Sequence, residues 1–429
     1  MDGTPDGVVP NLFMKEKQQH FDVIVIGGGA SGMTAAGRAG ALGKKVLLIE
    51  KNKLLGEKLR ISGGGRCNIT NATYDVREFL DYYGKAAPFL FSAFSQFGVK
   101  DTFTFFESLG LPLVVQARNR AFPHTEKAID VVNALTNYMK KGKVTVLTGT
   151  PVKRITHEDG KITGVVTAKE TFTAKNYILS TGGVSHPETG STGDGFKWLS
   201  GLGHEVKDPT PTIVPIAVSE DWVHMLSGVS LSFMKITFFL DDKKVFSKTG
   251  KILFTHFGLS GPLILNSAVK VGEMLQGGKV TAKIDAYPDT EIGTLDKTLI
   301  KKFDGFKNKM LKNILKEIVP EGMSPAIELI LSRSIDLNTK VHSITKEERR
   351  IIVDTLKALP ITVTNLMGYD RAVVADGGMS LEDIDMKTMQ TKKFPNLFVT
   401  GDLLHINRPT GGQSLQLCWT TGFVAGSNA

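Results

Sequence analysis

The feature that most constrains this sequence is a strand, a glycine-rich turn, a helix and a second strand near its start. Residues 22–26 (DVIVI) form an apolar run of strand length. Gly27, Gly29 and Gly32 follow in the spacing G-x-G-x-x-G, before a helix-compatible segment of small residues. Residues 44–50 (KKVLLIE) form the next strand and complete a βαβ unit of about 30 residues. We therefore expect an α/β fold built on a buried parallel sheet.

Each part of this unit has a role in dinucleotide binding. The first glycine permits the tight turn, the second lets the backbone approach a pyrophosphate, and the third lets the helix pack closely on the strand. The helix N-terminus adds unpaired N–H groups and partial positive charge. Glu50 ends the second strand, where its carboxylate can accept hydrogen bonds from both hydroxyls of an adenosine ribose. The alternatives are an ordinary glycine-rich turn and a surface charge at a strand end, but the three features in register favour a dinucleotide.

The composition is that of an ordinary globular protein and excludes several classes. The 429 residues suggest two or three domains, and 41% hydrophobic residues exclude disordered and fibrous chains. The net charge of +9 is spread along the chain and gives only weak support for nucleic acid binding. Cys67 and Cys418 lack CxxC spacing, so no metal site or dithiol pair is expected. Without an apolar run of about 20 residues or a signal peptide, we expect a soluble cytoplasmic protein with no membrane insertion.

The sequence changes character twice along its length. From Pro209 it is rich in short β-segments and proline, which predicts an inserted sheet or barrel. From Thr290 it is lysine-rich with helical periodicity, and the apolar run 397–400 indicates that the first domain resumes. The expected division is an N-terminal extension (1–20), the first part of a dinucleotide-binding domain (21–207), a β-rich inserted domain (208–289 and 350–361), a helical subdomain (290–349) and the second part of the first domain (362–429).

A second glycine cluster, Gly63 to Gly65, follows shortly after the βαβ unit. Its backbone could pack against a flat ring system that side chains would obstruct, whereas the alternative is a mobile loop. Lys58 or Arg66 could offset negative charge on a reduced cofactor, or each could be merely solvated. Cys67 is more consistent with an inert small side chain than with a reactive thiol, because no partner cysteine is near in sequence.

Two further small-residue turns follow apolar strands. One is formed by residues 181–183 (TGG), and the other by Gly401 and Asp402 with Gly412 further on. In a parallel sheet such turns lie at the carboxyl edge, where ligands bind. Asp402 could accept hydrogen bonds from a polyol such as ribityl, or could cap a helix. The N–H groups after Gly412 could stabilise a developing anion on a flavin pyrimidine ring.

Together these segments resemble the HI0933/BaiN-like flavoproteins, a family of NAD(P)/FAD-dependent oxidoreductases with aminoacetone oxidase-like members. The segments that carry the resemblance are 22–50, 61–68 (ISGGGRCN), 181–183 (TGG), 190–195 (GSTGDG), 253–262 (LFTHFGLSGP) and 410–416 (TGGQSLQ). It extends from about residue 21 to residue 426. It implies an α/β fold with a glutathione-reductase-type FAD-binding Rossmann domain, interrupted by a β-rich, barrel-like domain that carries a helical subdomain.

The resemblance also implies which residues contact FAD. The expected cofactor-binding residues are Gly27, Gly29, Ala30, Ser31, Gly32, Glu50, Lys51, Lys58, Ser62, Gly63, Gly64, Arg66, Cys67, Val152, Thr181, Gly182, Gly183, Gly401, Asp402, Gly412, Gln413, Ser414 and Leu415. The chain departs from the family near its end, where an aspartate, Asp402, stands in place of glutamate. There, His405, Asn407 and Arg408 also replace an acidic stretch. The family's substrates are therefore not carried over to this chain.

A flavin exchanges hydride at N5, so the protein must chiefly orient the substrate, exclude water and tune the ring. We predict that His256, in a turn at the end of an inserted strand, is a substrate contact or proton donor at an interdomain cleft. The alternative is a packed histidine without a catalytic role. Arg118, Arg120 and His124 could bind an anionic substrate or form a solvated loop. The sequence has no second strand–GxGxxG–helix unit, so NAD(P)H as a transient electron donor would enter the same cleft.

The sequence thus predicts an FAD-dependent oxidoreductase that transfers hydride between flavin N5 and a small-molecule substrate. One alternative is a flavoprotein that binds and modifies RNA, since the net charge would help phosphate binding and lysines concentrate between Lys297 and Lys316. Another is a non-catalytic flavin-bound sensor. The oligomeric state does not follow from the sequence.

Overall fold

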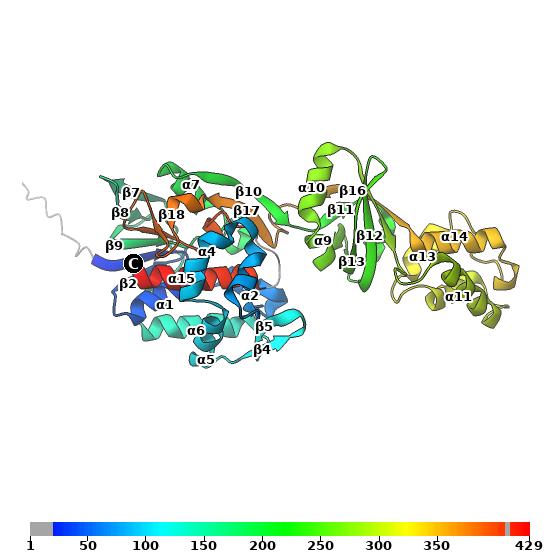
Figure 1. The fold of residues 1–429 in the computed structure, drawn as a ribbon, viewed down its shortest axis with the longest axis horizontal. Coiled ribbons are helices and arrows are strands. Elements are labelled where there is room, and N and C mark those ends of the chain that lie inside the picture. Colours follow the sequence, from blue (N-terminus) through cyan, green and yellow to red (C-terminus); the bar gives the residue numbers. More distant parts are fainter. Residues whose placement is uncertain (1–19, 408–411) are drawn as a thin grey trace, which may run out of the picture.

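The computed structural model describes residues 20–407 and 412–429 of the chain. Three parts follow one another along its longest axis (Figure 1): a sheet domain, a β-barrel and a helical subdomain at the far end. The sheet domain comprises residues 20–205 and 380–429, apart from the gap. The N-terminal extension expected over residues 1–20 lies outside the described residues except for His20, which begins the first strand.

The sheet domain is built on a nine-stranded sheet with a parallel centre. β1 (His20–Ile26) pairs in parallel with β2 (Val46–Ile49) on one side and with β9 (Thr171–Leu179) on the other. All four residues of β2 are buried, as a strand covered on both faces requires. The parallel sheet expected from the glycine-turn unit is confirmed. The other strands are β6 (Thr145–Leu147), β7 (Arg154–Glu158), β8 (Lys161–Val166), β18 (Ile384–Asp385), β19 (Gln390–Thr391) and β20 (Leu397–Val399).

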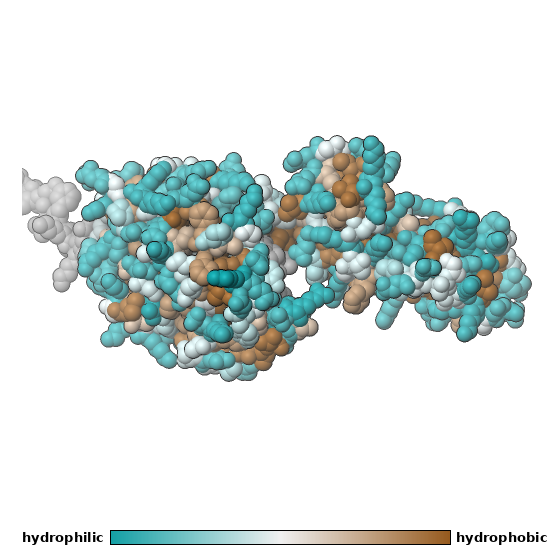
Figure 2. Space-filling view, in the orientation of Figure 1, coloured by the Kyte–Doolittle hydropathy of each residue, from teal (hydrophilic) through white to brown (hydrophobic). Residues whose placement is uncertain are grey.

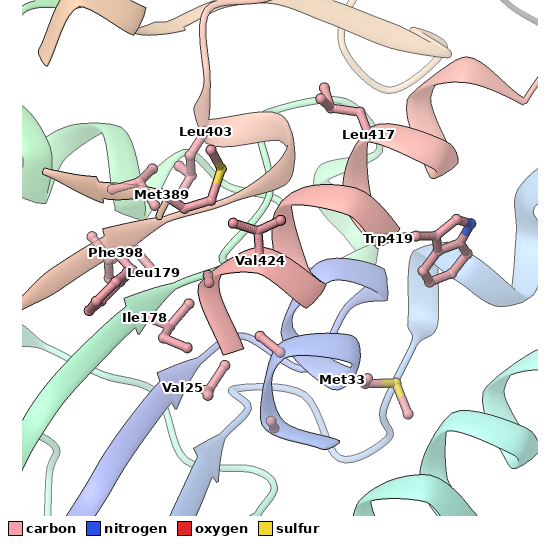
Figure 3. Packing of buried hydrophobic residues seen from close by; sticks show 14 of the residues in the cluster. Val25, Met33, Ile178, Leu179, Met389, Phe398, Leu403, Leu417, Trp419 and Val424 are labelled. Atoms are coloured by element: carbon pink, nitrogen blue, oxygen red, sulfur yellow. The ribbon is translucent and has the colours of Figure 1, made fainter. Parts of the chain in front are cut away.

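Two helices cross closely against this sheet. They are α1 (Ala30–Ala41) and α15 (Gln413–Asn428). A Cβ on Gly422 of α15 would lie only 2.4 Å from the carbonyl oxygen of Ser31, so only glycine permits this approach. Figure 3 shows Val25, Ile178 and Val424 among the side chains of the core that forms beneath.

The remaining elements of the sheet domain surround this core. Its other helices are α2 (Glu57–Ile61), α3 (Val76–Leu80), α4 (Ala87–Gln96), α5 (Val99–Ser108), α6 (Ala128–Lys141) and α7 (Asp194–Gly201). A small antiparallel sheet contains β3 (Thr70–Asn71), β4 (Leu113–Gln116) and β5 (Arg120–Pro123).

The inserted β-rich domain is a closed antiparallel barrel, which confirms the barrel-like expectation. In barrel order its strands are β11 (Ile216–Val218), β14 (Gly258–Ser260), β13 (Lys243–Thr255), β12 (Ser230–Leu240), β15 (Val280–Asp285) and β16 (Leu359–Leu366). Its helices are α8 (Asp221–Met225), α9 (Pro262–Leu265) and α10 (Ala268–Gly277). The sequence pattern does not predict α10, because its buried face is narrow and consists of Ala268, Val271 and Met274.

Four helices between β15 and β16 form the helical subdomain. They are α11 (Ile292–Gly305), α12 (Leu311–Ile318), α13 (Ser324–Leu331) and α14 (Lys346–Lys357). α14 extends past the expected boundary at residue 349, because Ile352, Val353 and Leu356 continue its buried face. The buried side chains of this subdomain and of the barrel form one continuous core.

Two paired strands connect the sheet domain to the barrel. β10 (Val206–Ile213) runs antiparallel to β17 (Val374–Met379), so the chain leaves the sheet domain and returns to it side by side. The expected boundary at residues 207/208 therefore falls inside β10, and residues 362–366 belong to the barrel strand β16 rather than to the second part of the first domain.

Hydrophilic residues cover most of the face seen in Figure 2, with separate hydrophobic patches on the sheet domain and the barrel. Within residues 20–407 and 412–429, none of the helices combines the length and apolar character needed to cross a bilayer.

Candidate active site

The glycine turn after β1 is tightly packed at Gly27 and Gly32 but open at Gly29. Gly27 has φ +106°, and a Cβ there would lie 2.4 Å from the carbonyl oxygen of Ser180. A Cβ on Gly32 would lie 1.9 Å from the carbonyl oxygen of Gly27, so α1 packs directly on the turn. At Gly29, by contrast, no described atom lies within 4 Å of the added Cβ. Gly29 is the N-cap of α1, and the first turn of α1 contains no acidic residue. The N–H groups of this first turn therefore face a space that a phosphate could occupy.

The Glu50 carboxylate is fixed beside this turn. Its Oε2 accepts a hydrogen bond from the backbone N–H of Gly28 at 2.6 Å, and its Oε1 accepts one from Asn52 N–H at 2.8 Å. Glu50 is almost completely buried. Each carboxylate oxygen can accept a second hydrogen bond, so the side chain remains able to bind two hydroxyls.

A cavity of about 680 Å³ extends from the glycine turn, a size typical of a cofactor or small-molecule site. The predicted site residues that line it are Gly27, Gly29, Ala30, Ser31, Glu50, Lys51, Lys58, Ser62, Gly63, Gly64, Val152, Thr181, Gly182, Asp402, Gly412, Ser414 and Leu415. On the side of the inserted domain the wall consists of Leu265 of α9 and of Val373 and Val374 at the start of β17. Segments far apart in the sequence thus meet around one space.

The other predicted cofactor residues do not line this cavity. They are Gly32, Arg66, Cys67, Gly183, Gly401 and Gln413. Gly32 is instead covered by the turn that it supports, and a Cβ on Gly401 would meet Ser31 Oγ at 2.9 Å. These two glycines shape the walls without facing the space.

Three buried polar atoms along the cavity have no hydrogen-bond partner within the described part of the chain. They are Asn68 Oδ1, Thr181 Oγ1 and Ser414 Oγ, and all three residues are lining residues. Buried polar atoms are nearly always satisfied, so their gathering here indicates a polar ligand. Together with the open space at Gly29, they fit a bound dinucleotide such as FAD.

Two lysines near the cavity are paired with carboxylates. Lys51 Nζ lies 2.8 Å from Asp194 Oδ2 and 2.6 Å from Thr192 Oγ1. Partial burial alone would raise the pKa of Asp194, but the hydrogen bonds from Lys51 and Thr192 have the larger effect. The pKa of Asp194 is therefore below its usual value. Lys58 Nζ lies 3.6 Å from Asp402 Oδ2. Both lysines are thus held in place at the cavity wall.

Arg66 and Cys67 make their contacts within the sheet domain and do not line the cavity. Arg66 Nη1 lies 2.9 Å from Glu126 Oε2, and its guanidinium lies 4.5 Å from the centre of the Phe122 ring. Cys67 is fully buried, and burial raises the pKa of its thiol to about 12 despite a hydrogen bond with Ser62. The thiol is therefore protonated and unreactive at neutral pH, in agreement with the inert interpretation.

His256 lies outside the cavity lining. It is exposed in the turn between β13 and β14, with its ring 5.0 Å from that of Phe257. Arg118, Arg120 and His124 are also absent from the cavity lining as described. The catalytic role of His256 stays a prediction.

The unusual residues near the chain end are only partly described. His405 Nε2 lies 3.7 Å from Asp376 Oδ1, and Asn407 is exposed. Arg408, with the first two residues of the predicted segment 410–416, lies outside the described residues.

One lining residue that sequence reasoning missed is His186. Its Nδ1 lies 2.8 Å from Glu188 Oε1, and the pair sits in the loop after β9. The available signal was a histidine directly before Pro187 in the glycine-rich stretch 182–195, a pattern that more often indicates a turn.

A family model described as the HI0933-like protein Rossmann domain matches residues 21–428. The chain belongs to this family. It is 27% identical over 408 residues to a 3-dehydro-bile acid delta(4,6)-reductase of Clostridium scindens, covering 94% of this chain and 98% of the relative. It is equally 27% identical over 409 residues to a ribosomal RNA dihydrouridine synthase of Escherichia coli, covering 95% and 97%.

Solved structures share this fold at low sequence identity. A 3-ketosteroid-delta4-(5alpha)-dehydrogenase from Rhodococcus jostii RHA1 is similar with a TM-score of 0.54 and 14% identity, covering 97% of this chain and 98% of that chain. Family membership makes this protein an FAD-dependent oxidoreductase with a Rossmann-type FAD-binding domain.

Proposed function

We propose that this enzyme uses FAD to reduce a carbon–carbon double bond conjugated to a carbonyl group, in the cavity where the sheet domain meets the inserted domain. The observation that carries the proposal is that one and the same cavity is lined by the dinucleotide turn and, on the side of the inserted domain, by apolar residues. Both relatives support the reaction class. A delta(4,6)-reductase and a dihydrouridine synthase are each named for adding hydrogen across such a double bond.

The residues of the sheet domain would hold the cofactor in an extended form. Glu50 would accept hydrogen bonds from the adenosine ribose, and the N-terminus of α1 at Gly29 would bind the pyrophosphate. Asp402 would bind the ribityl hydroxyls, and Lys58 beside it would offset negative charge. When bound, FAD supplies hydride transfer at N5.

The inserted side of the cavity would bind the substrate. Leu265, Val373 and Val374 offer an apolar wall that excludes water from the reacting bond. NAD(P)H would use the same space in a separate step, because the described chain shows one dinucleotide turn of this type.

Anaerobic rapid mixing of the FAD-loaded protein tests this proposal. We expect NADH or NADPH to bleach the flavin absorbance, and cyclohexenone or a 3-dehydro-delta(4,6) bile acid to restore it with formation of the saturated product. Bleaching without reoxidation by either compound would contradict the double-bond proposal. Failure of both nicotinamides to bleach would contradict NAD(P)H as donor.

RNA is a second candidate substrate, because uracil also has a double bond conjugated to a carbonyl. Seven lysines against one aspartate lie between residues 297 and 316, all seven lysines are exposed, and they lie on and between α11 and α12. Such a surface could contact phosphates. The relative from Escherichia coli supports this candidate.

Incubation of the reduced holoprotein with protein-free ribosomal RNA separates the two candidates. If RNA is the substrate, nucleoside mass spectrometry will show dihydrouridine, and retention on RNA will fall steeply with salt. Substitution of Lys309, Lys312 and Lys316 by glutamine would weaken retention without changing reduction by NAD(P)H. Absence of dihydrouridine would remove this candidate.

A further inference from the structure

His186 lines the cavity and forms a histidine–carboxylate pair with Glu188. His186 follows β9 and comes directly before the short helix η4 (Pro187–Thr189). Its Nδ1 lies 2.8 Å from Glu188 Oε1, and 28% of its side chain is exposed. Within residues 20–407 and 412–429, its Nε2 has no hydrogen-bond partner. The free nitrogen is therefore available to a ligand in the cavity.

The backbone of His186 is fixed in an uncommon conformation. Its φ is +53°, in the left-handed region that non-glycine residues seldom adopt. Its N–H donates to the carbonyl oxygen of Tyr369 at 2.9 Å, and its own carbonyl accepts from Thr189 N–H at 2.9 Å and from Thr189 Oγ1 at 2.7 Å. Such conformations persist where the surroundings impose them, and they concentrate at functional sites. The fold, rather than local preference, sets the position of this ring.

This loop contacts both sides of the cavity. On the inserted side, Tyr369 lies in the segment that leads from β16 to Val373 and Val374. On the cofactor side, Lys58 Nζ donates to Oγ of Ser185, the residue before His186, at 2.7 Å. His186 thus lies where the expected flavin contacts and the apolar substrate wall meet.

The carboxylate of Glu188 lies directly beside the His186 ring. Burial alone would raise the pKa of Glu188, but the hydrogen bond with His186 and the other favourable interactions outweigh it and lower the pKa below its usual value. The carboxylate is therefore ionised at neutral pH. Such a hydrogen bond orients the imidazole ring and determines which nitrogen carries the proton in the neutral form. Lys58 is paired with Asp402, and the titratable groups on the adjoining segment are Tyr369, Asp370 and Arg371.

We propose that His186, oriented by Glu188, is the proton donor for the reduction. This inference rests on the proposed function. The β-carbon of the substrate accepts a hydride, a new C–H bond forms, and the π electrons move to the carbonyl oxygen as an enolate. The Nε2–H bond of His186 then breaks, its electron pair stays on nitrogen, and the proton forms a C–H bond at the α-carbon. The substrate gains two electrons, which come from the flavin and ultimately from a nicotinamide reductant, and His186 regains its proton from water.

The variants His186→Gln and Glu188→Gln test this assignment in the FAD-loaded enzyme. We expect His186→Gln to keep its FAD content and its rate of reduction by NAD(P)H. Its rate of flavin reoxidation by cyclohexenone should fall about a hundredfold or more, in the range of general acid catalysis. The high-pH decline of the reoxidation rate should disappear. The matched control is His342→Gln, in the helical subdomain, which should behave as wild type.

A second readout does not depend on turnover. In protein labelled with [15N]histidine, NMR should show the hydrogen bond between His186 Nδ1 and Glu188, and Glu188→Gln should shift that signal. An unchanged His186 Nδ1 signal in Glu188→Gln, or an unchanged decline of the reoxidation rate in His186→Gln, overturns the proposal. If wild-type enzyme is reduced by NAD(P)H but leaves cyclohexenone, the 3-dehydro-delta(4,6) bile acid and ribosomal RNA all unreduced, the proposed function fails and the proton step fails with it. Reduction of the substrate with a slow His186→Gln variant supports both.

Discussion

The sheet domain and the helical subdomain differ in what their glycines do. In the sheet domain a Cβ on Gly27, Gly32 or Gly422 would come within 2.4 Å or less of a backbone oxygen. In α11 of the helical subdomain, a Cβ on Gly293 or Gly305 would meet no described atom within 4 Å apart from its chain neighbours and the backbone of its own helix. The backbone geometry of the first region thus depends on particular residues, whereas the second depends on the burial of one apolar face per helix.

The largest effect that this comparison predicts is that of a side chain at Gly32. Gly32→Val places carbon atoms against the carbonyl of Gly27, so α1 must move away from the turn. We expect loss of FAD binding and of most soluble protein, measured as flavin absorbance per chain after purification. Gly293→Ala is the matched control, and it should stabilise the helical subdomain by about 0.5–1 kcal/mol. A yellow, stable Gly32→Val protein would contradict the close packing.

A cavity in the inserted core should destabilise the protein without loss of the cofactor. Leu315 of α12 is 1% exposed, and Leu315→Ala should lower the free energy of unfolding of the inserted region by about 2–5 kcal/mol. Urea denaturation followed by circular dichroism measures this loss, and flavin absorbance should remain at the wild-type level. Lys316→Ala, at the exposed neighbour, should change stability by less than about 0.5 kcal/mol. A colourless Leu315→Ala protein would show that the two regions unfold together.

A smaller effect is expected from Glu50→Gln, which keeps the size of the side chain but removes its charge. The carboxylate has two acceptor oxygens, whereas the glutamine amide has one. The amide therefore cannot accept hydrogen bonds from both Gly28 and Asn52 and also from the ribose hydroxyls. We expect the affinity for FAD to fall about tenfold, measured by fluorescence titration of the apoprotein. Glu158→Gln, on the exposed end of β7, should leave the affinity unchanged. Equal affinities would place the ribose elsewhere.

The smallest effect is a pH dependence that belongs to the sheet domain. The His204 side chain is buried against Asp383, and burial lowers its pKa below the ordinary value of 6.5 although Asp383 opposes this shift. The unfolded chain therefore binds a proton more readily, and stability should fall as the pH drops below about 6.5. Melting curves between about pH 7 and pH 5 should show this decline, and His204→Gln should flatten it. His342→Gln, at an exposed site, should retain the wild-type slope.

The sequence predicts the βαβ unit at the cavity well because the information is local. Strand, turn, helix and acid lie within residues 22–50, and each has a direct structural requirement. The closed barrel is harder to predict, since β11 must pair with β16 across the whole helical subdomain. Composition indicates a β-rich insertion there, but not which strands meet.

The two histidines show the same difference between local and distant information. The sequence places His256 in a turn at the end of a strand, but whether that turn faces a cavity depends on how the barrel is oriented. In the structure, His256 is exposed. His186 reaches the cavity because its N–H bonds to Tyr369, nearly two hundred positions later in the chain. No local pattern around Ser185 and Pro187 encodes that contact.

The pairing of β10 with β17 means that the polypeptide departs from and rejoins the sheet domain at adjacent points. Lengthening or reshaping what lies beyond that junction leaves the register of the central strands unaltered. The fold therefore joins the sheet domain to the insertion through one pair of strands, so the insertion can change in length or shape by itself. A change in the insertion would alter the substrate side of the cavity while the residues expected to bind the cofactor stay in place.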